Sequence, residues 1–450
     1  MLSAAELKEW HDLRMVAVPK AIEPYYSLDA ATAVPLYAGP LLFPSRNGES
    51  REQADGMVSF ELRPAPHVVT RASVPRPLAV LHALDEVACP QLPAVLTVPE
   101  PPQMLSAAGN VSWPGPVRGW IVGKPAAARA VTFHLVNFME MHGAVIADRD
   151  YAWAGRVVVD VGPWHLTIDA RPDLRESLAI LRDHGGYAVT HTCALERRDG
   201  RVFAFARCQE LLTCLTWCLW FCRASAPAVI VPVGFDTNGR AIWSRWAAPY
   251  ADPLPDNHWQ WFDEAYGAEQ LSMLLPLFFA KWNDPAWRIT LQRAVRYYAD
   301  AAVMGTLQRN IVLAQVALES LAFAHLVKSS QRLLAGQFKA PVSRHIKQLL
   351  IDFDIPTTIP RSFYGLRKVR ANSPWDGPAA IAWLRNDIVH VDRGRVHTRR
   401  WKLWHQGWQL SLWYLELVVL AIVGYDGCYR NRLVGEPCAG AVELVPWATT

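Results

Sequence analysis

Proline is distributed unevenly along this chain of 450 residues, and this restricts the fold more than any other feature. Sixteen of the 33 prolines fall within residues 1–120, and only nine follow residue 268. Each proline removes a backbone donor and fixes φ, so this density is incompatible with long helices. Residues 1–120 are therefore predicted to form short strands and loops, with Pro99–Pro102 as a turn or small linker.

The pattern between about residues 129 and 265 predicts antiparallel β structure. Strands are expected where apolar side chains alternate or β-branched residues cluster, at Ala130–Phe138, Arg156–Val161, Trp164–Asp169, Tyr187–Leu195, Val202–Cys208, Ala228–Phe235 and Ala241–Trp246. A helix is expected at Gln209–Arg223. Residues 1–265 are thus predicted to form one mostly antiparallel β domain, sandwich-like and with few helices.

Beyond residue 265 the apolar period changes to 3.6, which is typical of helices. A connecting helix is predicted within residues 266–284, followed by an all-α bundle over residues 285–450. Its helices are expected at Ala286–Ala302, Thr306–Lys328, Ser343–Phe353, Ala379–Val391 and Arg399–Val423. The predicted fold class is α+β.

Composition excludes a disordered chain, because 51% of the residues are apolar and 19% are charged. The net charge of +4 does not by itself indicate a nucleic-acid partner. Evidence for such a partner has to come from the local distribution of charge. The apolar run Leu211–Cys222 is too short to span a bilayer, and Glu416 interrupts the run Leu410–Tyr425. The N-terminus lacks the apolar stretch of a signal peptide. No membrane span and a cytoplasmic location are expected.

Three of the eight cysteines, Cys214, Cys218 and Cys222, are spaced four residues apart and share one helix face. A cluster-binding face is one interpretation, and small apolar packing residues are the favoured one. No C-x-x-C pair occurs, which disfavours a zinc ribbon or a thioredoxin-like site. No H-E-x-x-H motif and no clustered Asp/Glu or Cys/His set is found either, so no metal and no other cofactor is expected.

The segment Arg385–His390 has the chemistry that RNA cleavage needs. RNA supplies its own nucleophile, the 2′-hydroxyl, so a catalyst has to move protons near neutral pH and stabilise the charge on phosphorus. Histidine titrates in that range, which suits His390 to proton transfer. Arg385 offers a planar fork of donors for phosphate oxygens and the transition state. Five positions separate the two residues by about 140° on an ideal helix, so they do not share one face.

This segment, with a polar residue after the arginine and a histidine at the helix end, resembles the R-x4-6-H motif of the HEPN superfamily. Ala317–Glu319 and Gly424–Arg432 resemble the corresponding stretches of its ApeA-like branch, in which a β-rich N-terminal domain precedes a HEPN domain. Gly234–Trp243 is also similar to that branch. The resemblance is specific over about residues 285–435 and only architectural over residues 1–265.

The resemblance implies that Asn386 orients the site and that two motifs face one cleft in a homodimer. Asp387 is expected to accept a hydrogen bond from His390 or Arg385, or else to face solvent. Glu319 either faces the cleft or, as we favour, pairs within the bundle, with an arginine of the motif helix as an obvious partner. Further basic side chains follow the motif, where an RNA backbone would pass: Arg393, Arg395, Arg399, Arg400 and Lys402.

The resemblance therefore implies a metal-independent endoribonuclease that acts in abortive-infection defence against phage, with tRNA as the expected substrate. The N-terminal domain would sense a phage-protein trigger or restrain the nuclease. The alternative is a non-catalytic HEPN module that binds RNA, a nucleotide or a protein.

Two further interpretations concern aromatic and basic residues. The Trp401–Trp408 stripe is expected to form core or dimer interface rather than a base-stacking surface. The segment Tyr429–Arg432 is expected either to bind phosphate or to be a solvated basic tail. A carbohydrate-active enzyme with tryptophan platforms is disfavoured, since no convincing carboxylate pair is found.

Overall fold

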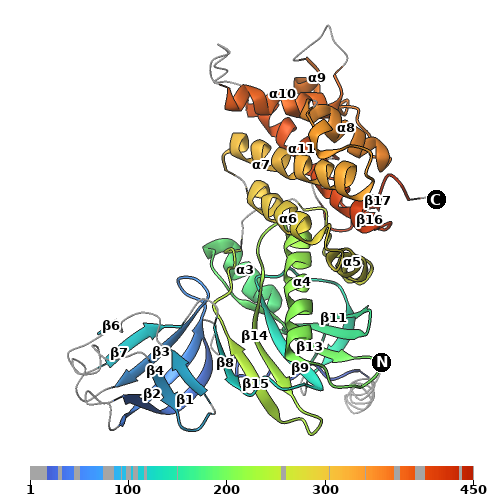
Figure 1. Cartoon of the computed structure of the whole chain (residues 1–450). Helices are drawn as coiled ribbons and strands as arrows, with labels where there is room; N and C mark the ends of the chain where they lie inside the picture. The colour runs from blue at the N-terminus through green and yellow to red at the C-terminus, as the bar shows by residue number, and fades with distance from the viewer. Residues whose placement is uncertain are drawn as a thin grey trace, which may run out of the picture. The chain divides into compact units, whose positions relative to one another are not determined.

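The fold is α+β, as predicted, with antiparallel sheets in the N-terminal part and helices in the C-terminal part of the chain (Figure 1). It is known from a computed structural model, which describes residues 18–28, 33–44, 51–73, 86–92, 94–97, 103–104, 110–115, 119–148, 151–254, 260–303, 305–339, 341–368, 375–390, 401–434 and 438–448. The chain divides into two compact units. The N-terminal unit comprises Met1–Leu212 and Pro227–Asp256, and the C-terminal unit comprises Thr213–Ala226 and Asn257–Thr450.

The first sheet of the N-terminal unit is antiparallel and has the strand order β5-β4-β1-β2-β3-β7-β6. Its strands are β1 (Ala33–Pro44), β2 (Arg51–Glu61), β3 (His67–Ser73), β4 (Glu86–Cys89), β5 (Ala94–Thr97), β6 (Gln103–Met104) and β7 (Asn110–Pro114). Alternate side chains of these strands are buried in an apolar core, which fits the expectation of strands and loops before residue 120.

The second sheet is also antiparallel, with the order β10-β11-β12-β13-β9-β14-β15-β8. Its strands are β8 (Trp120–Gly123), β9 (Ala130–Val136), β10 (Ala144–Ala147), β11 (Ala152–Val161), β12 (Trp164–Ala170), β13 (Val189–Arg197), β14 (Ala228–Phe235) and β15 (Ala241–Trp246). The predicted bounds of β14 and β15 are confirmed. Helix α3 (Leu174–His184), which the sequence analysis did not predict, buries three leucines beside this sheet.

The strand predicted at Val202–Cys208 is wrong. Helix α4 begins at Phe205 and continues to Arg223, so it includes the predicted helical segment. Only Phe203 pairs in β fashion, through a bridge to Ala128. The Phe205 ring then packs edge-on against Trp243, with the ring centroids 4.8 Å apart. The apparent alternation over seven residues thus reflects a single bridge followed by a helix start.

Two histidines are buried in the second sheet, His134 on β9 and His191 on the neighbouring strand β13. Burial lowers the pKa of His134 to about 4 and the pKa of His191 to about 3. In the unfolded chain these groups bind protons near pH 6.5. The unfolded state therefore holds more protons as the pH falls, and the free energy of unfolding decreases by up to about 1.4 kcal/mol per pH unit for each histidine.

We expect His191→Phe to flatten the loss of stability between about pH 6.5 and pH 4, because the new ring cannot be protonated. Urea unfolding measured across this range gives the slope. His184→Gln, at the exposed end of α3, is the matched control and should keep the wild-type slope. Equal slopes in wild type and His191→Phe would contradict the assignment.

The C-terminal unit is built from helices that enclose one long apolar helix, α11 (Figure 1). Besides the second half of α4, its elements are α5 (Gly267–Trp282), α6 (Arg288–Ala302), α7 (Leu307–Phe323) with a π turn (Ala324–Ser329), a 3-10 turn (Ala335–Gln337), α8 (Val342–Asp352), α9 (Tyr364–Lys368), α10 (Gly377–Val389), α11 (Trp401–Val423), β16 (Cys428–Tyr429) and β17 (Glu443–Leu444). Gly424, with φ +82°, ends α11 as expected.

Two helical stretches, Leu307–Ser329 and Trp401–Val423, are long and apolar enough to cross a membrane by length and composition alone. In the second, 89% of the most apolar window is buried inside the structure. Its apolar side chains are therefore accounted for by the core of the C-terminal unit.

Two glycines bring α10 and α11 into close contact. A Cβ atom on Gly407 of α11 would overlap Leu384 of α10, and a Cβ atom on Gly377 would overlap the Tyr414 hydroxyl. Leu384 follows Gly377 by seven residues on α10, and its partner Gly407 precedes Tyr414 by seven residues on α11. The two helices are antiparallel, and this register positions the segment that begins at Arg385.

Gly407→Ala is expected to destabilise the C-terminal unit by about 1–2 kcal/mol, because overpacking against the fully buried Leu384 outweighs the better helix propensity of alanine. Thermal or urea unfolding measures this loss. Gly336→Ala is the control, since nothing lies within 4 Å of an added Cβ atom there. An equal effect at both positions would contradict the close contact.

Candidate active site

Helix α10 presents the Arg385–His390 segment at its C-terminal end. The helix begins at Asp376, whose carboxylate accepts a hydrogen bond of 2.9 Å from the Ala379 amide, with Pro378 in the first turn. It ends at Val389, and His390 leaves the helical conformation with φ −109° and ψ 88° while its amide still donates to the Asn386 carbonyl at 3.0 Å. The predicted position of the motif at a helix end is thus observed.

Arg385 is half-buried and has an amide neighbour rather than a carboxylate. Its Nη1 donates to Oδ1 of Asn386 at 3.2 Å, and within the described ranges no acidic side chain forms an ion pair with it. A guanidinium has five N–H donors, so most of them remain for an anionic ligand. Asn386 is placed to orient this side chain.

His390 is exposed, and no hydrogen bond joins its ring to Arg385 or Asp387 in the part of the chain that the structure describes. Asp387 is half-buried and forms no ion pair there with Arg385. Within the described residues of one chain, a hydrogen bond thus joins Arg385 to Asn386, and none joins either of them to the His390 ring or the Asp387 carboxylate. A second copy of the motif could supply the missing neighbour, as the 140° separation suggested.

Glu319 lies on α7, half-buried, and its charge acts on His345 of α8 rather than on the motif. Ile311 of the same helix packs near Gly407, level with Leu384. Glu319 is eight residues further along, which is about 12 Å. The structure thus does not place Glu319 beside Arg385, and no ion pair joins the two among the described residues.

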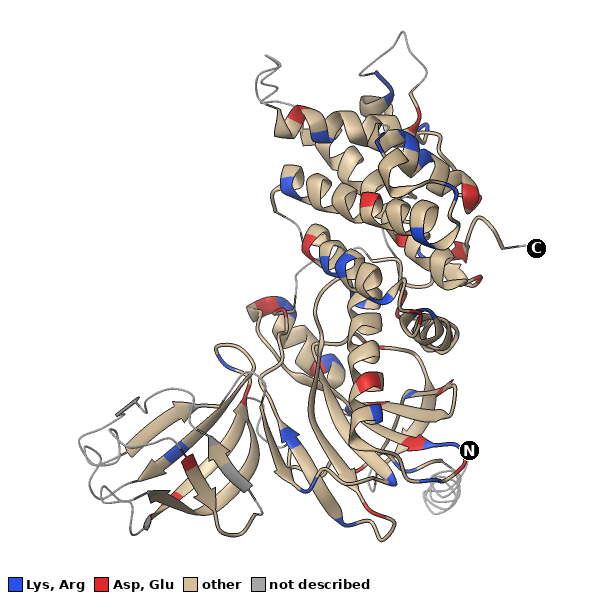
Figure 2. Cartoon of the chain, in the orientation of Figure 1, with Lys and Arg blue, Asp and Glu red and all other residues tan. Residues whose placement is uncertain are grey.

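The basic residues expected to follow the motif, Arg393, Arg395, Arg399 and Arg400, lie outside the described residues. On the helices of the C-terminal unit that are described, basic and acidic segments are interspersed (Figure 2). Within the described ranges, no three His, Cys, Asp or Glu side chains are grouped so that they could hold a metal ion. Cys214, Cys218 and Cys222 are buried thiols, in agreement with a packing role.

The tryptophans at the start of α11 do not share one environment. Trp408 is buried, and its indole nitrogen donates to the Ala301 carbonyl at 2.8 Å, so it belongs to the core. Trp401 is 62% exposed and stacks on the His405 ring, with centroids 4.7 Å apart and 17° between the planes. Burial lowers the pKa of His405. The expectation of core is thus confirmed for Trp408, whereas Trp404 is half-buried and Trp401 is exposed. Dimer interface stays a prediction for Trp401.

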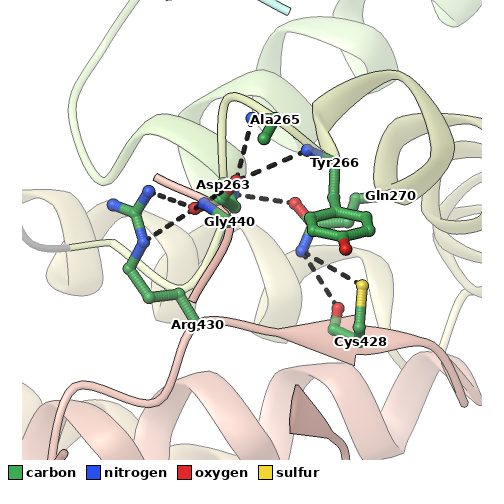
Figure 3. A network of polar contacts seen from close by, with 7 residues as sticks. All are labelled: Asp263, Ala265, Tyr266, Gln270, Cys428, Arg430 and Gly440. Carbon is green, nitrogen blue, oxygen red and sulfur yellow. Dashed lines mark hydrogen bonds and ion pairs between the residues drawn. The ribbon is translucent and has the colours of Figure 1, made fainter. Parts of the chain in front are cut away.

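Both interpretations of Tyr429–Arg432, phosphate binding and a solvated tail, are wrong, because its two arginines are structural. Arg430 forms an ion pair with the fully buried Asp263, to which its Nε donates at 3.1 Å (Figure 3). Asp263 also accepts from the amides of Ala265 and Gly440, and the nearby Gln270 donates to the Cys428 carbonyl at 3.0 Å. This network fastens the C-terminal segment to the chain just before α5.

Arg432 is 3% exposed and pairs with Glu416 in the middle of α11, where its Nε donates to Oε2 at 2.7 Å. The Tyr298 hydroxyl donates to the same carboxylate. Burial raises the pKa of Tyr298 well above its usual range, so the phenol keeps this proton. These partners are far apart in the sequence, and no local pattern indicates them.

A second titratable cluster was not found from the sequence. Asp352 of α8 accepts hydrogen bonds from His325 at 2.9 Å, Arg332 at 2.6 Å and Gln348 at 2.8 Å. His325 lies in the π turn after α7, a type of helix distortion that is frequent at functional sites. All three partners satisfy one carboxylate, so the cluster is complete without a ligand.

The protein is thus of the α+β class, with a β-rich N-terminal unit and a helical C-terminal unit. The candidate site, Arg385–His390, lies at the end of one helix of the helical unit. Comparison with known proteins identifies the family. The chain belongs to the YopA family: residues 123–257 match the YopA central domain and residues 284–443 match the YopA C-terminal domain. The candidate residues from Glu319 to His390 all lie within the second match.

The chain is also similar to a curated relative from Bacillus subtilis (strain 168), described as the SPbeta prophage-derived uncharacterized protein YopA. The two sequences are 30% identical over 321 residues, which is 70% of this chain and 72% of the relative. No solved structure matches the chain.

Buried and half-buried arginines of the C-terminal unit should differ sharply on substitution. Arg432→Met leaves the Glu416 carboxylate buried without its cation, and we expect a loss of about 3–5 kcal/mol in the free energy of unfolding. Arg385→Ala removes no ion pair of the described residues and should cost less than about 1 kcal/mol. Urea unfolding of both variants checks this difference, and similar losses would contradict it.

Proposed function

We propose that this protein is a metal-independent endoribonuclease of the HEPN kind, with its active site at the end of α10. One observation carries the proposal. The Arg385 guanidinium has no carboxylate partner among the described residues, and an exposed histidine, His390, follows at the end of the same helix. Arg430 and Arg432 of this unit are neutralised by Asp263 and Glu416, whereas Arg385 has no acidic partner among the described residues.

In this reaction the 2′-hydroxyl of the RNA attacks the adjacent phosphorus. One His390 ring takes the proton from the hydroxyl or gives one to the leaving 5′-oxygen, and the product carries a 2′,3′-cyclic phosphate. Arg385, oriented by Asn386, binds the non-bridging oxygens and stabilises the charge that grows on them.

The site is complete when two chains meet. Arg385 and His390 lie about 140° apart around one helix axis, and a symmetric homodimer would bring the motif of a second chain into the same cleft. An even number of subunits is therefore part of the proposal.

The biological setting follows the resemblance to ApeA-like proteins. The N-terminal unit would sense a phage-protein trigger, or restrain the nuclease until infection, and tRNA is the proposed substrate in the cytoplasm. The Bacillus relative is described as prophage-derived, which is in keeping with a role in conflict between phages and their hosts.

The alternative is a non-catalytic module in which the same unit binds RNA, a nucleotide or a protein. One observation favours it: within a single chain, His390 has no contact with Arg385 among the described residues. Cleavage itself distinguishes the two functions.

Purified full-length protein, incubated with total RNA or tRNA in EDTA, should yield fragments with 2′,3′-cyclic phosphate ends. We expect Arg385→Ala and His390→Ala each to reduce cleavage by about 100-fold or more, the range attributed to general acid–base and electrostatic groups. Arg344→Ala, an exposed arginine on α8, is the control and should cut normally. Cleavage that survives either motif substitution would refute the site, and RNA binding without cleavage in wild type would favour the alternative.

A further inference from the structure

An exposed aromatic surface lies beside the candidate active site, where α9 packs on the start of α11. We define it by Trp401 and Lys402 of α11 together with Tyr364 and Lys368 of α9. The Leu366 amide of α9 donates to Oε1 of Gln406 at 3.2 Å, which holds the two helices together. Trp401 is 62% exposed and Tyr364 is 47% exposed, so both rings face solvent.

The aromatic rings of this surface are supported by their neighbours. One face of Trp401 rests on His405, 4.7 Å away at 17°, and among the described residues no other ring stacks on it. The Lys402 ammonium lies 5.1 Å from the Tyr364 ring centroid, and the Lys368 ammonium lies 5.6 Å from the same centroid. Interaction with Lys402 lowers the pKa of Tyr364. The surface thus offers flat rings and two ammonium groups together.

The charge around these rings has one sign. The stretches 361–368 and 401–408 contain Arg361, Arg367, Lys368 and Lys402 and no Asp or Glu. Elsewhere on the unit acidic and basic segments are mixed (Figure 2). Aromatic rings interleaved with basic side chains match a nucleic-acid strand, whose bases stack and whose phosphates are anionic.

Helix register places this surface next to the motif. Leu384 is level with Gly407, and Gly377 is level with Tyr414. Six residues beyond Leu384 is His390, and six residues before Gly407 is Trp401, so the two lie at the same level of the antiparallel pair. A strand that binds along this end of the helix pair can therefore meet both His390 and the indole.

We propose that Trp401, Tyr364, Lys402 and Lys368 form a binding surface for single-stranded RNA, with one unpaired base stacked on Trp401. The inference rests on the proposed function and narrows its substrate class to an unstacked nucleotide, as in a loop. A base inside a duplex is stacked on both sides and has no free face for the indole. Trp401 is thus a positioning residue for the scissile nucleotide.

Binding is tested in the full-length His390→Ala variant, which keeps the surface and does not cut. The probe is a short fluorescein-labelled RNA of mixed sequence, used as a single strand and as a duplex. Adding Trp401→Ala should weaken single-strand binding by roughly 5- to 150-fold, the range for loss of one base–aromatic stack. Trp401→Phe should restore most of it, and duplex binding should not depend on this position.

Lys402→Ala should lower affinity for every sequence and reduce the salt slope by about one. Ile289→Ala, an exposed apolar residue on α6, and Lys339→Ala, an exposed lysine before α8, are the matched controls and should bind normally. Sedimentation of each variant reports the oligomeric state.

Single-strand affinity that is unchanged by Trp401→Ala would overturn the inference, even if Arg385 and His390 prove catalytic. A Trp401→Ala variant that loses its dimer instead of its RNA affinity would likewise overturn it and assign the surface to a second copy of the chain. Failure of the wild-type protein to cut would count against the proposed function alone, because the binding measurement does not require cleavage.

Discussion

The buried pair between Glu416 and Arg432 is the interaction on which the C-terminal unit depends. Glu416 lies in the middle of α11, the helix around which the other helices pack, and its carboxylate has no access to water. An uncompensated charge in such a place costs several kcal/mol, so the segment after α11 has to return to it. Arg430 then binds Asp263 in front of α5, and the two ends of the unit become tied to each other (Figure 3). Apolar side chains form most of the core. The two charge pairs determine that the segment after α11 packs against α11 and against the chain before α5.

The candidate site has the opposite character. Arg385 is half-buried with a neutral amide as its partner, and His390 lies where α10 ends and the backbone turns away. The preceding residue Leu384 packs closely against Gly407, so α10 is held against α11 up to the motif. Polar side chains without protein partners at the end of a well-packed helix are typical of a ligand-binding site.

The strands β14 and β15 and most long helices could be predicted because their patterns extend over several turns or alternations within one local segment. Val202–Cys208 was misassigned because a pattern of only seven residues can fit the period of a strand or that of a helix. The contact of Phe205 with Trp243 favours the helix. The position of Arg385–His390 at a helix end was foreseen from the helical pattern of Ala379–Val391. The structural role of Arg430 and Arg432 was not, since Asp263 is 167 residues before Arg430 and spacing along the chain carries no sign of such pairs. The exposure of Trp401 depends in the same way on which helices pack on α11.

The glycine contacts between α10 and α11 also bear on how this protein can change in evolution. Because Gly377 and Gly407 set the helix register, the distance from His390 to Trp401 is a property of two packed helices and not of the residues that join them. Insertions or deletions between residues 391 and 400 would therefore leave the end of α10 and the start of α11 at the same level. Relatives could differ in length there while one pair of small residues keeps the two helices in register.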